Sequence, residues 1–223
     1  MHLIIISCTP RAAGRSNTAK IIEQFKAGFE QESGTAEVHY LSQRSAWGAI
    51  RDAFYSNRHI LFAIPLFVEC IPGIMLEFLE TLEPKKYPEG AERTKIGFIL
   101  QSGFAEASQL RCGEQYLEML PGYLNCDYAG TLIKGNMFSV SLIGGKSGQA
   151  LVAPFIGMGR QYAKHPIFEK ETVSEFAKPE YYSKGFILLH TVLSPLQKLF
   201  MTIMAKKLGC KGSLKAKPYQ KYL

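Results

Sequence analysis

Residues 3–18 read Leu-Ile-Ile-Ile-Ser-Cys-Thr-Pro-Arg-Ala-Ala-Gly-Arg-Ser-Asn-Thr, and the expected architecture can be built outward from this stretch. The apolar run Leu3–Ile6 is short and rich in β-branched residues, which is typical of a parallel strand buried on both faces. A turn-rich segment follows, and Ser16 or Asn17 then begins a helix with apolar residues at helical spacing that ends near Gly34. This order of strand, loop and helix predicts the first unit of an α/β fold.

The same alternation continues along the chain. Further strands are expected at residues 38–41, 59–64, 95–100 and 129–133, and further helices at 49–55, 75–82, 107–120 and 150–163. Strands that alternate with helices at this spacing predict a doubly wound, five-stranded parallel sheet of the α/β class. We expect residues 1–165 to form this domain and residues 166–223 to form a helical C-terminal extension with a basic tail.

Composition narrows the class of protein. Of the 223 residues, 47% are hydrophobic and 20% are charged, which is typical of a globular protein and excludes a disordered or collagen-like chain. The cysteines are odd in number and contain no CxxC pair, so they favour reduced thiols in the cytoplasm over disulfides or a zinc site. The N-terminus has only a short apolar run without a basic segment before it, so we expect a strand there and no targeting peptide.

The net charge of +7 is distributed unevenly. Residues 184–223 contain eight lysines and no Asp or Glu, so residues 1–183 hold the other 18 basic residues together with all 19 acidic ones. The basic character therefore belongs to the tail, and a globally basic nucleic-acid-binding protein is not expected.

Ligands of an open parallel sheet bind beyond the carboxyl ends of its strands, where the strand order reverses. Residues 7–18, 65–73 and 101–106 follow three of the expected strands. The first of these segments suits a phosphate group, because backbone N–H groups at a helix start are unpaired and the helix dipole favours an anion. The hydroxyl and arginine side chains of this segment can supply the remaining contacts to the phosphate. The alternative reading is an ordinary capped helix with solvated arginines.

Two other nucleotide-binding motifs are incomplete in this sequence. Gly145-Lys146-Ser147 resembles the end of a P-loop, but the first glycine of that motif would fall at Val140. Gly157-Met158-Gly159 would need a third small residue where Tyr162 stands. A Walker ATPase and a standard dinucleotide-binding fingerprint are both disfavoured.

Three loops together resemble those of a known family. Ser7-Cys8-Thr9-Pro10-Arg11, followed by Gly14-Arg15-Ser16-Asn17-Thr18, resembles the phosphate loop of the flavodoxin-like NAD(P)H-dependent FMN reductases. Pro65-Leu66-Phe67-Val68 with Ile71-Pro72-Gly73 is similar to their second flavin loop, and Ser102-Gly103-Phe104-Ala105-Glu106 is similar to their third. The order of the three loops makes the resemblance more specific than any single motif, and it covers about residues 1–165.

The resemblance implies a flavodoxin-like fold, an FMN cofactor, and NADPH or NADH as co-substrate. Hydride would pass from the nicotinamide to the flavin, and electrons then to a small-molecule or protein acceptor. The resemblance assigns the FMN phosphate to Thr9, Arg11, Ser16, Asn17 and Thr18, and the ring system to Pro65, Leu66, Phe67, Val68, Ser102, Gly103, Phe104 and Glu106. We expect no catalytic protein residue, because the redox chemistry belongs to the cofactor. Reductases of this kind commonly form homodimers.

The sequence departs from the family pattern at several points. Cys8 replaces the usual glycine of the phosphate loop, and we expect it to be a buried, inert thiol. Phe67 stands where a tyrosine is frequent. Residues 42–56 contain no cysteine, whereas some relatives place an iron–sulfur ligand cluster there, so we predict neither such a cluster nor a structural metal.

The C-terminal extension leaves three alternatives open. Phe186–Ala205 is long and apolar, but His190, Pro195, Gln197 and Lys198 interrupt it. It can form a helix that covers the core or a neighbouring subunit, a helix on a membrane surface, or a transmembrane span, in that order of preference. Two alternatives to the reductase function follow: a non-catalytic flavodoxin-like electron carrier, and a membrane-surface protein on a flavodoxin-like scaffold without its cofactor.

Overall fold

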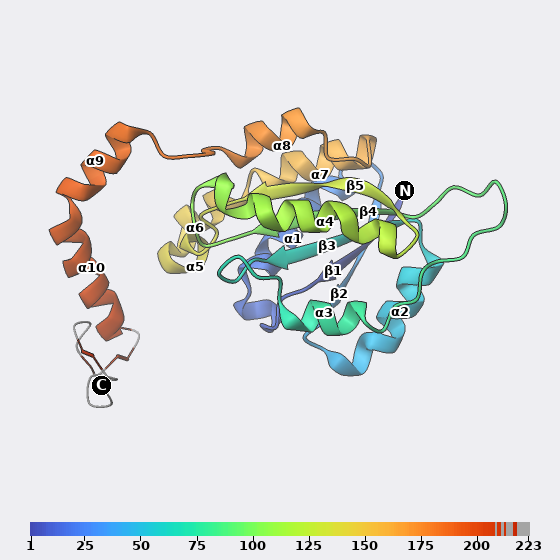
Figure 1. Cartoon of the computed structure of the whole chain (residues 1–223), viewed down its shortest axis with the longest axis horizontal. Coiled ribbons are helices and arrows are strands. Elements are labelled where there is room, and N and C mark those ends of the chain that lie inside the picture. The colour runs from blue at the N-terminus through green and yellow to red at the C-terminus, as the bar shows by residue number, and fades with distance from the viewer. Residues whose placement is uncertain (208, 211, 213–215, 218–223) are drawn as a thin grey trace. The chain divides into compact units, whose positions relative to one another are not determined.

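Figure 1 shows a computed structural model of the chain, which describes residues 1–207, 209, 210, 212, 216 and 217. Its strands are β1 (His2–Ser7), β2 (Thr35–Tyr40), β3 (His59–Pro65), β4 (Lys95–Gln101) and β5 (Asp127–Lys134). They form one sheet in the order β2-β1-β3-β4-β5, and every neighbouring pair is parallel. This is the flavodoxin-like strand order, so the predicted fold class is confirmed.

The register places apolar residues side by side at the centre of the sheet. Ile5 of β1 lies opposite Val38 of β2 and Leu61 of β3. Since helices cover both faces, these central strands are apolar without alternation, as the sequence predicted.

Helices connect the strands and continue beyond them. They are α1 (Asn17–Glu30), α2 (Trp47–Ser56), α3 (Gly73–Leu79), α4 (Arg111–Tyr123), α5 (Ser139–Ile143), α6 (Gly145–Val152), α7 (Phe155–Lys164), α8 (Lys170–Ala177), α9 (Lys184–Val192) and α10 (Ser194–Lys207). Short 3₁₀ turns cover residues 13–15, 44–46 and 107–110.

Two expected helices differ from those observed. The helix expected at 150–163 is divided between α6 and α7, because Pro154 lacks a backbone N–H and precedes the first residue of α7. The helix expected from residue 107 begins as a 3₁₀ turn and becomes α-helical at Arg111. Neither difference changes the order of the elements.

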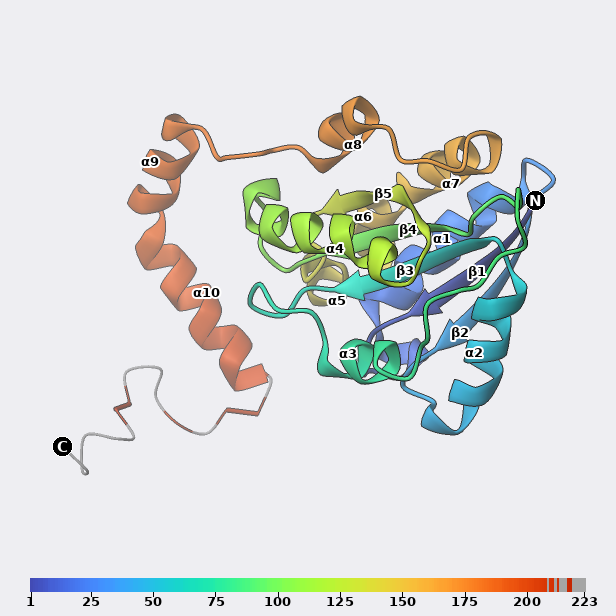
Figure 2. The ribbon, with the colours of Figure 1, turned by 45° about the vertical axis from the view of Figure 1, so that its right-hand side comes forward.

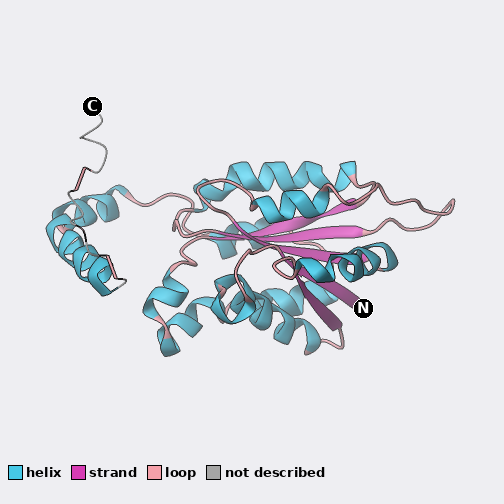
Figure 3. Ribbon diagram, turned by 90° about the horizontal axis from the view of Figure 1, so that it is seen from below, coloured by secondary structure: helices cyan, strands magenta, loops and turns pink. Residues whose placement is uncertain are grey.

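The sheet lies between two helical layers (Figure 3). α1 and α7 pack against each other on one face, and two glycines bring their backbones together. A Cβ atom added at Gly28 of α1 would lie 1.9 Å from the Ile156 carbonyl oxygen, and one added at Gly159 of α7 would lie 2.0 Å from the Phe25 carbonyl oxygen. Gly159 therefore serves helix packing, which agrees with the failure of the dinucleotide motif at this point.

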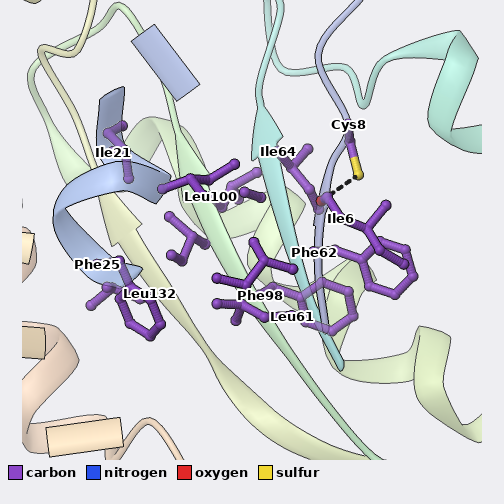
Figure 4. Close-up of a cluster of buried hydrophobic side chains, with 14 of the residues drawn as sticks. Ile6, Cys8, Ile21, Phe25, Leu61, Phe62, Ile64, Phe98, Leu100 and Leu132 are labelled. Atoms are coloured by element: carbon purple, nitrogen blue, oxygen red, sulfur yellow. Dashed lines mark hydrogen bonds between the residues drawn. The ribbon is translucent and has the colours of Figure 1, made fainter. Parts of the chain in front are cut away.

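The core is continuous across the sheet. In Figure 4, Ile21 and Phe25 of α1 lie on one side of the central strands, and Phe62 and Phe98 lie on the other, with their rings stacked at a centroid distance of 5.9 Å. Cys8 belongs to the same cluster, and its Sγ donates to the Ile6 carbonyl oxygen at 3.5 Å.

The chain divides into two compact units, Met1–Tyr181 and Tyr182–Leu223. Residues 166–181 belong to the first unit: Phe168 N donates to the Ala129 carbonyl oxygen of β5 at 2.8 Å, and α8 buries Val173 and Ala177. The first unit thus continues beyond the expected boundary at residue 165, because α8 packs on the edge strand β5.

The second unit contains α9 and α10, in which no described residue is buried. No single helix in the described part of the chain has the length and apolar composition needed to cross a membrane. α9 and α10 would satisfy that test only as a pair, and their axes differ by 66°.

Candidate functional site

A hollow of about 400 Å³ opens beyond the carboxyl ends of β1, β3 and β4. Because the strands are parallel, the loops that leave these ends meet at one edge of the sheet (Figure 2). The strand order reverses between β1 and β3, which is where parallel sheets bind their ligands. The lining residues are Thr9, Arg11, Ser16, Asn17, Thr18, Pro65, Leu66, Phe67, Val68, Gln101, Ser102, Gly103, Phe104 and Phe138.

The structure brings together every predicted site residue except Glu106. Glu106 lies just before the 3₁₀ turn at 107–110 and is not among the lining residues. Two lining residues were not predicted, Gln101 and Phe138. A polar residue at the end of an otherwise apolar strand was a signal for Gln101. Phe138 follows β5 and comes from a fourth loop, for which the sequence offered no motif.

The start of α1 forms one end of the hollow. Ser16 is the N-cap, and its Oγ accepts from the backbone N–H of Ala19 at 3.2 Å. The hydroxyl proton of Ser16 remains able to donate to another group. The first turn of α1 contains no acidic residue, and its leading N–H groups have no partner within the helix. This end of the hollow therefore favours an anion.

The side chain of Asn17 joins α1 to the segment that follows β5. Its Nδ2 donates to the Met137 carbonyl oxygen at 2.8 Å, and its Oδ1 accepts from the Ser141 hydroxyl. Both ends of the side-chain amide therefore hold the segment around Phe138 against α1. The backbone N–H of Asn17 and the second hydrogen of its Nδ2 remain able to donate to an anion.

Thr9 and Arg11 shape the loop before α1. Thr9 is buried, and its Oγ1 accepts from the backbone N–H of Arg11 at 3.2 Å. The side chains of Arg11 and Arg15 are exposed, and residues 7–22 contain no acidic residue. The charged side chains of this segment are therefore all basic.

Gln101 joins the end of β4 to α1. Its Nε2 donates to Thr18 Oγ1 at 3.2 Å, and both side chains are almost completely buried. Since a hydroxyl that accepts from an amide keeps its own proton free, Thr18 can donate into the hollow. The pair thus supplies an oriented hydroxyl group beside the helix start.

A tight turn carries Phe67 and Val68 into the opposite wall. Phe67 N donates to the Cys70 carbonyl oxygen at 2.9 Å, and Cys70 N donates to the Phe67 carbonyl oxygen at 3.0 Å. The two residues between them, Val68 and Glu69, have φ angles of 48° and 65°. A positive φ is costly for a β-branched residue, and such strain concentrates in ligand-binding loops.

The third wall combines the loops after β4 and β5. Ser102 Oγ donates to the Phe104 carbonyl oxygen at 3.1 Å, and Asn136 N donates to the same oxygen at 2.7 Å. This close approach requires a glycine, since a Cβ added at Gly135 would lie 2.5 Å from that oxygen. Phe104 and Phe138 remain more than half exposed, so the mouth of the hollow presents aromatic surface.

Cys8 lies at the start of the loop between β1 and α1, but its side chain belongs to the hydrophobic core. It is fully buried, and burial raises the pKa of its thiol well above the ordinary value. The thiol is therefore held protonated and turned away from the hollow. Among the residues that the structure describes, no group of three or more His, Cys, Asp or Glu side chains could hold a metal ion.

Comparison with known proteins gives a structural likeness only. No family model matches this sequence, and no curated protein matches it either. An NAD(P)H:quinone oxidoreductase from Methanothermobacter marburgensis superposes with a TM-score of 0.55 at 15% identity, over 74% of this chain and 96% of that one.

Two further structures contain FMN. An FMN-dependent NADH-azoreductase from Bacillus anthracis in complex with FMN has a TM-score of 0.53 at 13% identity, over 75% of this chain and 99% of the other. General stress protein 14 from Treponema denticola in complex with FMN also has a TM-score of 0.53, at 12% identity, over 73% of this chain and 97% of the other. These likenesses establish the flavodoxin-like fold for this chain.

Proposed function

We propose that this protein is an FMN-dependent oxidoreductase that takes hydride from NADPH or NADH and passes electrons to a small-molecule acceptor. The observation that carries the proposal is the hollow at the β1/β3 switch point, where an anion-binding helix start meets an apolar, aromatic wall. A flavin mononucleotide needs this combination, because its phosphate is charged and its planar ring system has large aromatic faces.

The donor chemistry of the residues fits this group. The N–H groups of the first turn of α1, the hydroxyls of Thr9, Ser16 and Thr18, and the Arg11 guanidinium are suited to the phosphate. When bound, FMN supplies the redox chemistry by accepting hydride and releasing electrons. The chain binds and orients the cofactor, and Leu66 and Phe67 keep water from the apolar wall.

The names of the structural neighbours support the same class of reaction. They include an NAD(P)H:quinone oxidoreductase and an FMN-dependent NADH-azoreductase. Both names indicate a nicotinamide donor, and they support a small organic acceptor for this protein over a protein partner.

The test is reconstitution of the full chain with FMN, followed by anaerobic addition of NADPH or NADH. We expect the protein to retain FMN through gel filtration and the absorbance of oxidised flavin to disappear after nicotinamide is added. Retained FMN without this loss of absorbance would indicate an electron carrier. Failure to retain FMN would contradict the proposed cofactor itself.

We further propose a homodimer in the cytoplasm, with residues 1–165 as the core of the flavin-binding domain. All five cysteines are free thiols, which supports a reducing compartment. Light scattering of the FMN-loaded protein measures the oligomeric state, and a monomer at micromolar concentration would contradict the homodimer.

A further inference from the structure

α9 and α10 expose an unusual amount of apolar surface. Every large apolar side chain from Phe186 to Phe200 is at least 37% exposed, and the structure buries no described residue of either helix. The exposed apolar residues are Phe186, Ile187, Leu188, Leu189, Val192, Leu193, Leu196, Leu199, Phe200, Met201 and Ile203. An exposed apolar surface of this extent indicates a binding site for a membrane or for another molecule.

Four of the apolar residues of α10 lie together along its axis. Leu196, Leu199, Phe200 and Ile203 recur at intervals of three and four residues, so they occupy one side of the helix. Lys198 and Thr202 occur four residues apart and lie on the other side, where Thr202 Oγ1 donates to the Lys198 carbonyl oxygen. α10 is therefore amphipathic, with a lysine on its polar side.

The charges around these helices have one sign. Lys184 begins α9, and Lys206 and Lys207 end α10. Residues 184–223 contain eight lysines and no acidic residue. A surface that combines exposed apolar side chains with unopposed lysines is complementary to a layer of anionic lipid headgroups over hydrocarbon.

The two helices are suited to lie in a membrane surface and not to cross it. α10 has 14 residues and is about 21 Å long, whereas a bilayer's hydrocarbon core is about 30 Å thick. The pair is bent by 66° at Leu193, where Gln197 hydrogen-bonds to His190 Nδ1. Lys198 would also fall within the core of a span.

A second copy of the same segment is a poorer partner. Two such segments would bring 16 lysines together without one carboxylate, since each contributes eight. The rest of the chain, with 18 basic and 19 acidic residues, is close to neutral and offers no strong excess of negative charge.

From these observations we infer that α9 and α10 bind the surface of membranes that contain anionic lipids, with their apolar side chains below the headgroups and their lysines among them. This inference stands apart from the proposed redox function, because it rests on the second unit alone.

The experiment is sedimentation of the full chain with vesicles of phosphatidylcholine alone and of phosphatidylcholine with phosphatidylglycerol. We expect strong binding only to the anionic vesicles, weakened by salt. Changing Lys198, Lys206 and Lys207 to Gln should lower that binding on the order of 100-fold. The matched control changes the exposed Lys86, Lys146 and Lys170 of the first unit to Gln and should leave binding unchanged.

A second variant tests the apolar contribution. Changing Leu196, Leu199 and Phe200 to Ser should abolish binding to the anionic vesicles while circular dichroism of the first unit's fold is retained. The inference is overturned if neither vesicle binds, or if the lysine variant binds as well as its control. It is equally overturned if the serine variant converts a vesicle-free dimer into a monomer, since the helices would then pair with a second copy.

Discussion

α1 and α10 have the same length and a similar spacing of apolar residues, but only α1 buries them. Ile21, Phe25 and Phe29 of α1 are inaccessible to solvent, whereas Leu199, Phe200 and Ile203 of α10 are about half exposed. The difference shows that helical spacing predicts an apolar face and does not say what covers it. α1 is covered by the sheet and by α7, whereas α10 is not covered by any described element of its own unit.

Charge separates the two units as clearly as burial does. α1 contains Glu23 and Glu30 as well as lysines, and Lys26 pairs with Glu30 at 3.6 Å. α9 and α10 contain lysines and no acidic residue. An element of a folded domain commonly mixes both signs on its solvent side, whereas a one-signed element favours a surface of opposite charge.

The largest difference in stability is expected when one phenylalanine ring is removed from each helix, Phe25 from α1 and Phe200 from α10. Phe25→Ala should lower the free energy of unfolding by about 3–5 kcal/mol, because the ring is fully buried against Tyr162 and Phe168. Phe200→Ala should change it by no more than about 0.5 kcal/mol. Chemical denaturation in lipid-free buffer measures both values. Equal losses would mean that α10 is packed against protein in solution.

The glycine contact between α1 and α7 provides the next test. Gly159→Ala should destabilise the protein by about 2–3 kcal/mol, because the new methyl group meets the Phe25 carbonyl oxygen and the helices must separate. Gly157→Ala, in the same helix, meets no atom within 4 Å and should be neutral or slightly stabilising. Thermal unfolding distinguishes the two variants. If Gly157→Ala were as damaging as Gly159→Ala, the close contact at Gly159 would not explain the loss, because alanine is otherwise favoured over glycine inside a helix.

A smaller effect separates cofactor binding from stability. Thr18→Val should weaken FMN binding by about 1–2 kcal/mol, because it removes a hydroxyl that lines the hollow beside the start of α1. Thr202→Val makes the same change in α10 and should leave FMN affinity unchanged. Titration of each apoprotein variant with FMN, monitored by the quenching of flavin fluorescence, gives the two dissociation constants.

Gln101 should act through Thr18 in the same measurement. If the amide orients the hydroxyl, Gln101→Leu and Thr18→Val together should cost less than the sum of the two single changes. Strict additivity of the two losses would show that Gln101 contacts the cofactor independently.

The smallest effect concerns pH. Burial, with a contribution from nearby Lys95, lowers the pKa of His59, and its Nδ1 is buried without a hydrogen-bond partner. The unfolded chain therefore takes up a proton at a higher pH than the folded protein does. The free energy of unfolding is therefore highest above a pH of about 6.5 and decreases as the pH falls below it. Because the group is only half-buried, the decrease should be less than about 1 kcal/mol.

Denaturation midpoints between pH 7.5 and pH 5.5 measure this loss. His59→Gln should reduce the dependence on pH, and His190→Gln in the exposed helix α9 should retain it. A pH dependence that persists unchanged in His59→Gln would assign the loss to other groups.

Much of the first unit was predictable because its signals are local. Apolar β-branched runs identified the strands, and the loop from Thr9 to Thr18 has its hydroxyls, arginines and helix start within one short segment. Parallel strands place their carboxyl ends at one edge, so loops after three strands could be expected to meet there. The five-stranded parallel sheet is confirmed by the structure, which also brings these loops together.

Other features depend on residues far apart in the chain, and local patterns could not specify them. Gln101 reaches Thr18 across 83 positions, and Asn17 reaches Met137 across 120, so the roles of Gln101 and Phe138 emerged only when those elements packed together. The docking of α8 on β5 and the Gly28–Gly159 contact have the same origin. The sequence by itself determines which segments are apolar or charged. Only the tertiary structure decides which of those surfaces are covered, because burial depends on the geometry of the partner as well as on the segment itself.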